Sequence, residues 1–269
     1  MKKEDTIINP YQPYIELGVE QLSRLDCSQL GISHFYEFSL GQNESHEVKA
    51  VPDGSIDLLF NIGSGKVTTY ISGTVFQVKA WELGDENRCF GVRFQPGLGV
   101  LPKDLSMNMI VNDDIEIDGN IFGGHITERI AEAGNISERS RIFKEVYENL
   151  LYYRMAFSDK EKINEYLVSR IVRAKGQLSM QVLEEETKYS ACYLRRIFKE
   201  FHGISPKQFA QYVRFQYLLG KIKNEDVRYD MLALECGYYD EAHMMREFKK
   251  YAGMTMEEIK TMEKIKKWC

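Results

Sequence analysis

The pattern of hydrophobic and polar positions indicates β-structure in the first part of the chain. Between Gly31 and Phe94, short runs rich in β-branched and aromatic residues are separated by turn residues such as Pro52-Asp53-Gly54. This spacing is typical of an antiparallel barrel or sandwich, so we expect an all-β core. The predicted strands lie in GISHFYEFSL (31–40), SIDLLFNI (55–62), KVTTYIS (66–72), TVFQVKAW (74–81) and RCFGVRF (88–94).

A helical pattern replaces the strand pattern after Gly99. From Ile136 to Phe157 the apolar residues recur at helical spacing and form one stripe, which predicts a single amphipathic helix. The sequence leaves two interpretations open: the stripe packs on the barrel, or it also meets a copy of itself in a homodimer. Its members are Ile142, Phe143, Val146, Tyr147, Leu150, Leu151 and Met155.

A domain boundary is expected near Ser158. Ser158 or Asp159 offers a helix N-cap, and every segment downstream has a helical pattern. A chain of 269 residues is also long for one compact domain and comfortable for two. We therefore predict an α+β protein of two domains. Residues 1–157 form a cupin-like β-barrel with helices, as an effector or regulatory domain, and residues 158–269 form an all-α domain.

Composition excludes several classes of protein. With 43% hydrophobic and 28% charged residues, the chain can bury cores and is neither disordered nor fibrous. The opening MKKEDTIINP has no apolar stretch of signal-peptide length, and no later segment approaches the roughly 18 apolar residues of a membrane span. We therefore expect a cytoplasmic protein without a membrane partner.

Charge is distributed unevenly between the two expected domains. The whole chain carries a net charge of −5, which divides into −9 for residues 1–157 and +4 for residues 158–269. Neutralisation of phosphates by Lys and Arg supplies much of the affinity of proteins for nucleic acids. The modest basic excess therefore favours nucleic-acid binding by the second domain.

Cysteine and histidine positions indicate neither a disulfide framework nor a metal site. The five cysteines are scattered and contain no Cys-x-x-Cys pair, and no two of the five histidines stand at the spacing of a metal-ligand pair. Asp53, Asp57, His34 and His46 are candidates for lining a pocket, but isolated polar residues of this kind define no site. We therefore predict no metal, no cofactor and no catalytic residue, and we assign no effector-binding residue.

The second part of the chain contains an internal repeat. The segment YLRRIFKEFHGISPKQF (193–209) aligns with HMMREFKKYAGMTMEEI (243–259) at a constant offset of 50 residues. Upstream, Leu183 matches Leu232 at an offset of 49, so the copies differ by one residue in the turn. Such a repeat indicates one supersecondary motif used twice.

Each copy has the pattern of a helix-turn-helix motif. A short apolar helix, 180–187 or 229–236, precedes a turn, and a longer helix follows a capping residue, Ser190 or Asp240. The longer helix of each copy should bury one apolar face. The predicted inner residues are Leu194, Ile197, Phe198 and Phe201 in the first copy and Met244, Phe248 and Tyr251 in the second.

A linker helix is expected between the two copies. Ser205-Pro206 is a strong helix start with proline at the first helical position, and the helical pattern runs from Lys207 to about Lys223. At 1.5 Å per residue this helix spans about 25 Å. A rod of that length can hold two reading helices roughly one DNA turn, about 34 Å, apart, in successive major grooves.

At these residues the chain closely resembles the AraC/XylS family of bacterial transcription regulators. The resemblance lies in LSMQVLEEETKYSACYLRRIFKEFHGISPKQF (178–209) and LALECGYYDEAHMMREFKKYAG (232–253). It implies a DNA-binding regulator with an N-terminal domain that senses a signal or dimerises. VPDGSIDLLFNI (51–62) and FGVRFQPG (90–97) are similar to one β-barrel class found on family members. Double-stranded DNA is the implied partner; RNA polymerase, a small-molecule or protein effector and a second copy of the chain stay open as further partners.

The resemblance and the outward faces of the longer helices mark the candidate DNA-binding residues. Arg196 and Arg246 are equivalent in the repeat and are expected to clamp phosphates or read guanine. Cys192 and Ala242 stand where family members face base edges and are small enough to pack against thymine methyl groups. The full set is Ser190, Ala191, Cys192, Arg195, Arg196 and Lys199 in the first copy and Asp240, Glu241, Ala242, His243, Met245, Arg246 and Lys249 in the second.

Several positions depart from the family pattern. Lys188 stands where the first turn usually has glycine, and a left-handed lysine costs about 1 kcal/mol. Tyr238 and Met244 replace other aromatic residues, and the Ser-Pro that normally follows the second unit is missing from Met254-Thr255-Met256. Glu241 repels phosphate and can only accept hydrogen bonds, for example from a cytosine amino group. The second motif is therefore expected to be less typical.

Two functions other than DNA-binding regulation are considered as alternatives. A cupin-like enzyme would need metal-ligand spacing, a nucleophile motif or a glycine-rich phosphate loop, and the sequence contains none of these. An interaction or sensor protein that kept the fold and lost DNA binding is the other alternative. We expect a non-enzymatic regulator, while the operator sequence and the choice between activation and repression stay open.

Overall fold

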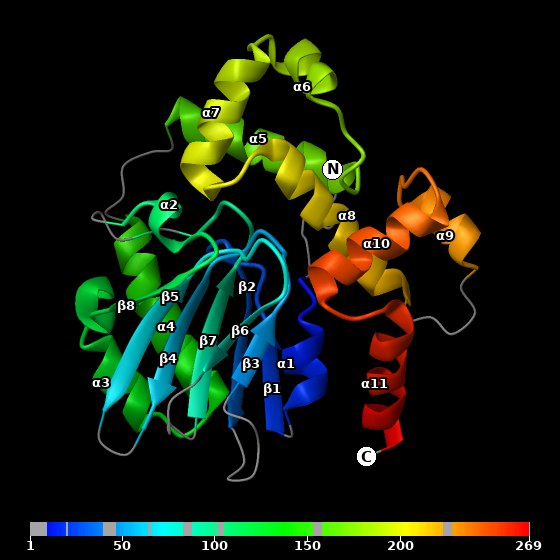
Figure 1. Cartoon of the computed structure of the whole chain (residues 1–269). Helices are drawn as coiled ribbons and strands as arrows, with labels where there is room; N and C mark the ends of the chain where they lie inside the picture. The colour runs from blue at the N-terminus through cyan, green and yellow to red at the C-terminus, as the bar shows by residue number, and fades with distance from the viewer. Residues whose placement is uncertain are drawn as a thin grey trace.

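The computed structural model describes residues 10–19, 21–39, 47–63, 66–82, 88–99, 101, 105–152, 158–222 and 228–268. The first part of the chain forms sheets with flanking helices and the second part forms a group of helices (Figure 1). The predicted α+β fold of two domains is therefore confirmed. Among the described helices, none is both long and apolar enough to cross a membrane.

The strands of the described residues form two antiparallel sheets. Their bounds are β1 (Gln21–Asp26), β2 (Ile32–Ser39), β3 (Glu47–Ala50), β4 (Asp57–Ile62), β5 (Val67–Ser72), β6 (Lys79–Glu82), β7 (Arg88–Phe94) and β8 (Asp114–Ile117). The larger sheet has the order β1-β2-β7-β4-β5-β8, and the smaller one pairs β3 with β6. Each predicted strand run thus contains a strand.

The helices flank the sheets in the first part of the chain and make up the second part. Those in the first part are α1 (Pro13–Gly18), α2 (Met107–Ile110), the 3-10 helix η2 (Gly119–Phe122), α3 (Ile126–Glu132) and α4 (Ile136–Tyr152). Those in the second part are α5 (Asp159–Arg173), α6 (Met180–Thr187), α7 (Ala191–His202), α8 (Pro206–Ile222), α9 (Tyr229–Glu235), α10 (Glu241–Ala252) and α11 (Met256–Trp268).

The strand β6 begins later than the sequence predicts, at Lys79 instead of Thr74. The residues before it hydrogen-bond to the turn between α2 and β8. Gly73 donates its backbone N–H to the carbonyl of Ile110 at 3.0 Å, and Asn112 donates to the carbonyl of Thr74 at 2.8 Å. These long-range bonds replace a regular strand ladder.

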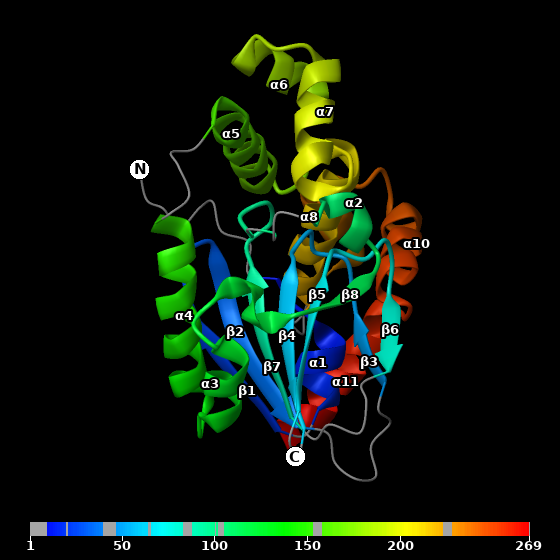
Figure 2. The same cartoon turned by 90° about the vertical axis from the view of Figure 1, so that its left-hand side faces the viewer.

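Alternation along the strands gives the larger sheet two different faces. In β4, Leu58 and Phe60 are fully buried on one side, whereas Asp57 and Asn61 point to the other. The first face packs against α4, where the Phe143 ring meets Phe60 edge-on with centroids 6.5 Å apart. The β3–β6 pair and α1 lie over the opposite face (Figure 2). The apolar stripe of α4 therefore packs on the sheet, and its predicted last member, Met155, lies outside the described residues. Whether the stripe also pairs with a second copy stays a prediction.

The second part of the chain starts with a capped helix. Ser158 is the N-cap of α5, and its side chain forms a capping box with Glu161. The helices that follow share one apolar core, which includes Leu194, Phe215 and Phe248. This core supports both predicted helix-turn-helix motifs.

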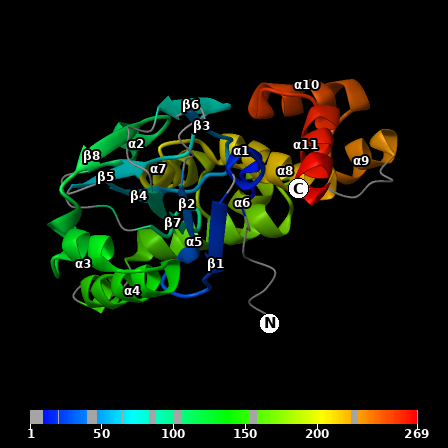
Figure 3. The ribbon, with the colours of Figure 1, turned by 90° about the horizontal axis from the view of Figure 1, so that it is seen from below.

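The segment that contains α1 joins the two parts of the molecule. Seen from below, α1 lies between the sheets and the C-terminal helices α10 and α11 (Figure 3). The Tyr11 hydroxyl donates to Glu263 of α11 at 2.9 Å, and the Tyr14 hydroxyl donates to the carbonyl of Ala252 in α10 at 2.6 Å. Tyr11 and Val51 also belong to the apolar core of the helices, so that core extends into the first part of the chain.

Candidate nucleic-acid interface and an adjoining cavity

The two predicted reading helices, α7 and α10, are built alike. Each has 12 residues, and their bounds differ by the same 50 positions as the sequence repeat. The side chain of Ser190 accepts the N–H of Tyr193 at the start of α7, and Asp240 accepts the N–H of His243 at the start of α10. Both helices end at a left-handed glycine, which relieves the steric cost of that conformation. The two copies therefore form the same structural unit.

The turn before α7 contains the left-handed lysine that the sequence predicts. Lys188 has φ of 62° and ψ of 12°, and its backbone N–H donates to the carbonyl of Glu184 at 2.8 Å. Gly237 takes the equivalent place before α10 with φ of 72°. The Glu184 carboxylate also stabilises the turn before α7, because it accepts the backbone N–H of Ala191 at 2.5 Å. A carboxylate at that place also suits the positive end of the α7 dipole.

The predicted inner and outer faces of the reading helices agree with the burial of their side chains, with Phe201 only partly buried. Arg196 lies with its guanidinium 5.2 Å from the centroid of the Tyr193 ring, which orients the side chain along the helix surface. The exposed candidates are Ser190, Cys192, Arg195, Arg196, Lys199, Asp240, Glu241, Ala242, Met245, Arg246 and Lys249. These side chains are placed to meet a partner.

Two candidate residues are less accessible than the sequence suggests. Ala191, the first residue of α7, is half-buried, and its backbone N–H donates to the Glu184 carboxylate. His243 is half-buried as well, with its ring edge-on to Tyr238 and the centroids 5.5 Å apart. Their backbone N–H groups are engaged by Glu184 and Asp240, respectively, so their contribution to a DNA interface stays a prediction.

An ion pair that was not among the sequence-based expectations holds α10 on α8. Arg214 donates from Nη2 to Glu247 at 2.8 Å, and its guanidinium lies 4.3 Å from the centroid of the Tyr238 ring. Glu247 is only 9% exposed. The repeat carried a signal, since Glu247 aligns with the apolar Ile197 of the first copy. A carboxylate on a buried face needs a partner.

A cavity of about 250 Å³ lies against the face of the larger sheet that points away from α4. Asp53 and Asp57, two of the four pocket candidates, line it. His34 does not; it is buried with Nδ1 3.0 Å from the Ser33 hydroxyl, and burial lowers its pKa to about 2. His46 lies outside the described residues.

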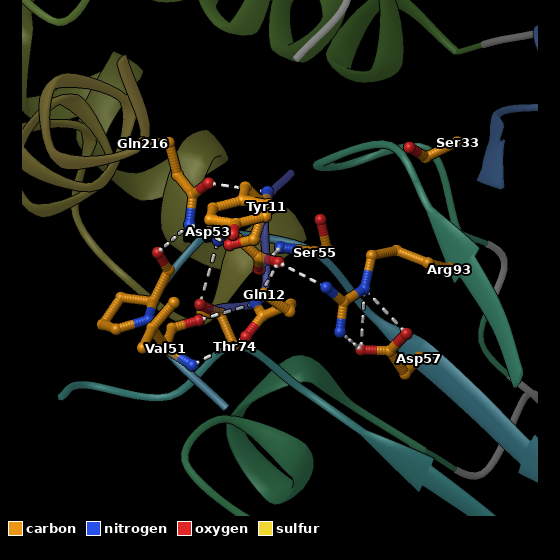
Figure 4. A network of polar contacts seen from close by, with 12 residues as sticks. Tyr11, Gln12, Ser33, Val51, Asp53, Ser55, Asp57, Thr74, Arg93 and Gln216 are labelled. Atoms are coloured by element: carbon orange, nitrogen blue, oxygen red, sulfur yellow. Dashed lines mark hydrogen bonds and ion pairs between the residues drawn. The ribbon is translucent and has the colours of Figure 1, made fainter. Parts of the chain in front are cut away.

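Arg93 is the residue of this cavity that the sequence analysis missed. It lies between two carboxylates: Nε donates to Asp57 Oδ1 at 2.9 Å, and Nη1 lies 3.1 Å from Asp53 Oδ2 (Figure 4). Burial raises the pKa of Asp57, and the charge of Arg93 opposes that rise. An arginine in the apolar run RCFGVRF could have indicated such a buried pair.

A chain of hydrogen bonds leads from this cavity to α8 (Figure 4). Gln12 donates from Nε2 to Asp53 Oδ2 at 2.8 Å and accepts the N–H of Val51 at 2.8 Å. One residue earlier, Tyr11 donates its backbone N–H to Gln216 Oε1 in α8 at 2.9 Å. The wall of the cavity and the helix between the two motifs are therefore connected through residues 11 and 12.

The described residues contain no group of three or more His, Cys, Asp or Glu side chains arranged to hold a metal ion. The polar contacts of Arg93 with Asp53 and Asp57 are ion pairs between side chains. Nothing in this cluster resembles the paired acid and base of a hydrolytic site, because the guanidinium occupies the space between the carboxylates.

Comparison with known proteins found a family match in each part of the chain. Residues 183–262 match a family described as a helix-turn-helix domain, and residues 29–116 match a family described as a domain of unknown function, DUF6597. The chain is 29% identical over 107 residues to an uncharacterized HTH-type transcriptional regulator of Haemophilus influenzae. That match covers 39% of this chain and 36% of the relative, so it spans about a third of the relative's length.

Several solved structures are similar to this one. The C-terminal domain of AraT, a response regulator from Geobacillus stearothermophilus, has 18% identity and a TM-score of 0.34, and covers 40% of this chain and 88% of that one. ToxT from Vibrio cholerae has 15% identity and a TM-score of 0.40, and covers 90% of this chain and 98% of that one.

The matched region begins within α6 and contains the remainder of both repeated motifs, with the capped helices α7 and α10 and the linker helix α8. This part of the molecule is therefore a helix-turn-helix domain that contains two copies of the motif. The family match and the relative agree with the helix-turn-helix motifs that the sequence repeat predicts.

Proposed function

We propose that the protein is a sequence-specific, double-stranded DNA-binding transcription regulator of the AraC/XylS type. The observation that carries this proposal is the equivalence of α7 and α10, which share length, capping, terminating glycine and an exposed arginine at the same position. A repeated, exposed helix with a basic outer face suits insertion into successive major grooves. DNA as the target is consistent with action in the cytoplasm of a bacterium.

The proposed contacts to DNA are the exposed residues of these two helices. Arg196 and Arg246 supply the main charge-assisted contacts, and Lys199 and Lys249 lie one turn further along, where phosphates are within reach. Ser190 and Asp240 cap α7 and α10, so they fix the first turn of each helix that is proposed to face the DNA. Residues 158–269 are the proposed DNA-binding domain, and residues 1–157 the proposed regulatory domain.

The regulatory role of the first domain is supported by its contact with α8. Gln216 accepts the N–H of Tyr11 and donates to the carbonyl of Pro52 at 2.9 Å. Since α8 joins the two motifs, a change in the first domain can alter their relative position. A small-molecule effector is the proposed signal, and the described cluster around Arg93 supports binding in preference to catalysis.

A gel-shift experiment with the full chain and the intergenic DNA beside its own gene tests the proposal. A specific complex that survives excess competitor DNA is expected. Selection of bound sequences from a random DNA library extends the test to operators elsewhere. A folded protein that selects no sequence and binds no promoter DNA would identify it instead as an interaction or sensor protein that has lost DNA binding.

A further inference from the structure

The residues that line the cavity are arranged in rows across the larger sheet. The strand register places Arg93, Asp57, Ser72 and Asp114 side by side on β7, β4, β5 and β8. We call these four residues the acidic row. Asp53 joins it from the loop before β4 through its contact with Arg93. All five residues line the cavity.

The cavity continues along the strands away from the acidic row. Leu59 pairs with Tyr70 on β5, and Tyr36 lies over Gly91 so closely that a Cβ there would be 2.1 Å from the ring. Asn61 lies at the far end, four residues from Asp57, which corresponds to about 13 Å along a strand. The lining is therefore acidic at one end, apolar in the middle and an amide at the other end.

The charge of the lining favours a cation. Three carboxylates, those of Asp53, Asp57 and Asp114, face the cavity with the single guanidinium of Arg93. Arg93 is already engaged by Asp57 and Asp53. An anion would add negative charge to a buried site that has an excess of it, whereas a cation relieves that excess. Lys79 is close to the Trp81 ring but pairs with Asp113 and does not line the cavity.

Two buried polar groups on the lining point to a ligand. Asn61 is 6% exposed and Ser55 is 2% exposed. Among the residues that the structure describes, neither Asn61 Oδ1 nor Ser55 Oγ has a hydrogen-bond partner. Buried polar atoms without partners are rare because desolvation is unfavourable, so both atoms are available to a ligand in the cavity.

We propose that this cavity binds a small, elongated organic cation. Its ammonium group lies at the acidic row, its apolar body lies over Leu59 and Tyr36, and Asn61 accepts a hydrogen bond from its far end. The volume of about 250 Å³ exceeds the roughly 150 Å³ of an apolar cavity that can hold benzene, which fits a ligand of this size. The ring of Trp81, whose Nε1 donates to Asp114 in the acidic row, adds cation–π attraction. Binding of the cation follows from the cavity alone, whereas its role as the effector rests on the proposed function.

Trp81 provides a direct reporter of binding, because it lines the cavity and the chain has only one other tryptophan, Trp268. In the full chain carrying Trp268→Phe, with excitation selective for tryptophan over the 16 tyrosines, the tryptophan emission comes from Trp81 alone. Three probes with the same apolar chain separate the charge classes: n-hexylamine, 1-hexanol and hexanoate. We expect a saturable change with the amine, about tenfold weaker binding of the alcohol, and none of hexanoate. Equal or tighter binding of hexanoate, or no change with any probe at millimolar concentration, would overturn the proposal.

A matched pair of variants tests the acidic row. Asp114→Asn keeps an acceptor for Trp81, whose Nε1 donates to Asp114 at 2.7 Å, and removes one negative charge. Glu128→Gln removes the same charge from exposed α3, on the other side of the sheet. We expect Asp114→Asn to weaken hexylamine binding about fivefold or more and Glu128→Gln to leave it unchanged; equal effects would contradict the assignment. Failure of DNA binding would reject the proposed function and leave the fluorescence result standing.

Discussion

Gln216 holds the backbone of Tyr11 in a buried contact between the two domains. Its Oε1 accepts the Tyr11 N–H at 2.9 Å, and its Nε2 donates to the Pro52 carbonyl at 2.9 Å. Because Gln12, the next residue, contacts Asp53 in the cavity wall, this amide is the last member of a polar chain that ends in α8. A side chain with one donor and one acceptor group suits this place, since both backbone partners are buried.

Replacement of Gln216 by Leu should loosen the domain contact. The change leaves buried backbone groups without partners, and we expect a loss of about 1–3 kcal/mol in the free energy of unfolding. Hydrogen exchange of residues 10–19 should become faster. Gln208→Leu is the matched control, because Gln208 lies in the same helix and donates to Tyr212 within it. Equal exchange of residues 10–19 in the two variants would show that Gln216 does not hold this segment.

Arg196→Ala and Arg246→Ala should each weaken binding to a selected operator by about 1–3 kcal/mol, the usual loss for a good base or phosphate contact. The reason is their equivalent exposed positions on α7 and α10. Fluorescence anisotropy with labelled operator DNA measures the change. Arg141→Ala serves as control, since Arg141 is exposed on α4 in the other domain. If both variants bind like the unmodified protein while circular dichroism shows them folded, the proposal that α7 and α10 both read DNA is wrong.

Sequence patterns predicted the helical domain more fully than the sheet domain for a physical reason. Helix starts depend on local chemistry, so Ser158, Ser190 and Asp240 could be recognised as caps from their neighbours. Strands β1, β3 and β8 gave no comparable signal, because they are short or lie at a sheet edge. Their pairing depends on residues far away in the chain.

The same distinction applies to the functional residues. The exposed face of α7 and α10 follows from helical periodicity, and the repeat doubles the signal. The cluster of Arg93 with Asp53 and Asp57 depends on the register between β4 and β7, which a single sequence does not contain. Asp53 and Asp57 could be named as candidates from their place near a predicted strand start. The arginine in RCFGVRF hinted at a buried ion pair, but its pairing with these two residues depends on the register.

Glu241 is expected to discriminate between DNA sequences instead of anchoring the protein. It is exposed at the first position of α10, beside Asp240, which already serves as the cap. A carboxylate there stabilises the helix through its dipole by about 0.3–1 kcal/mol but opposes DNA unless a cytosine amino group meets it. Glu241→Gln should tighten non-specific binding and relax the preference at one base pair. Binding to operators mutated under the second motif measures this; a uniform weakening on every operator would mark Glu241 as structural.

The free energy of unfolding should decrease as the pH is lowered below about 6.5, and buried His202 is one cause. Burial lowers the pKa of His202 to about 3, and its Nε2 donates to Asn164 Oδ1 at 2.9 Å. Between that pKa and the ordinary value of about 6.5, the unfolded chain binds a proton that the folded protein does not. The stability that neutral His202 provides is therefore complete above pH 6.5, and it decreases by up to about 1.4 kcal/mol per pH unit below it.

A double variant isolates this contribution. His202→Leu together with Asn164→Leu removes both members of the buried hydrogen bond, so neither is left without a partner. Urea unfolding at pH 7, 6 and 5 should give a shallower dependence of the free energy of unfolding on pH than in the unmodified protein. The dependence should not vanish, because buried His34 in the sheet domain, with its pKa lowered to about 2, keeps its own contribution. If the double variant loses stability with falling pH as steeply as the unmodified protein, His202 is not a source of the acid sensitivity.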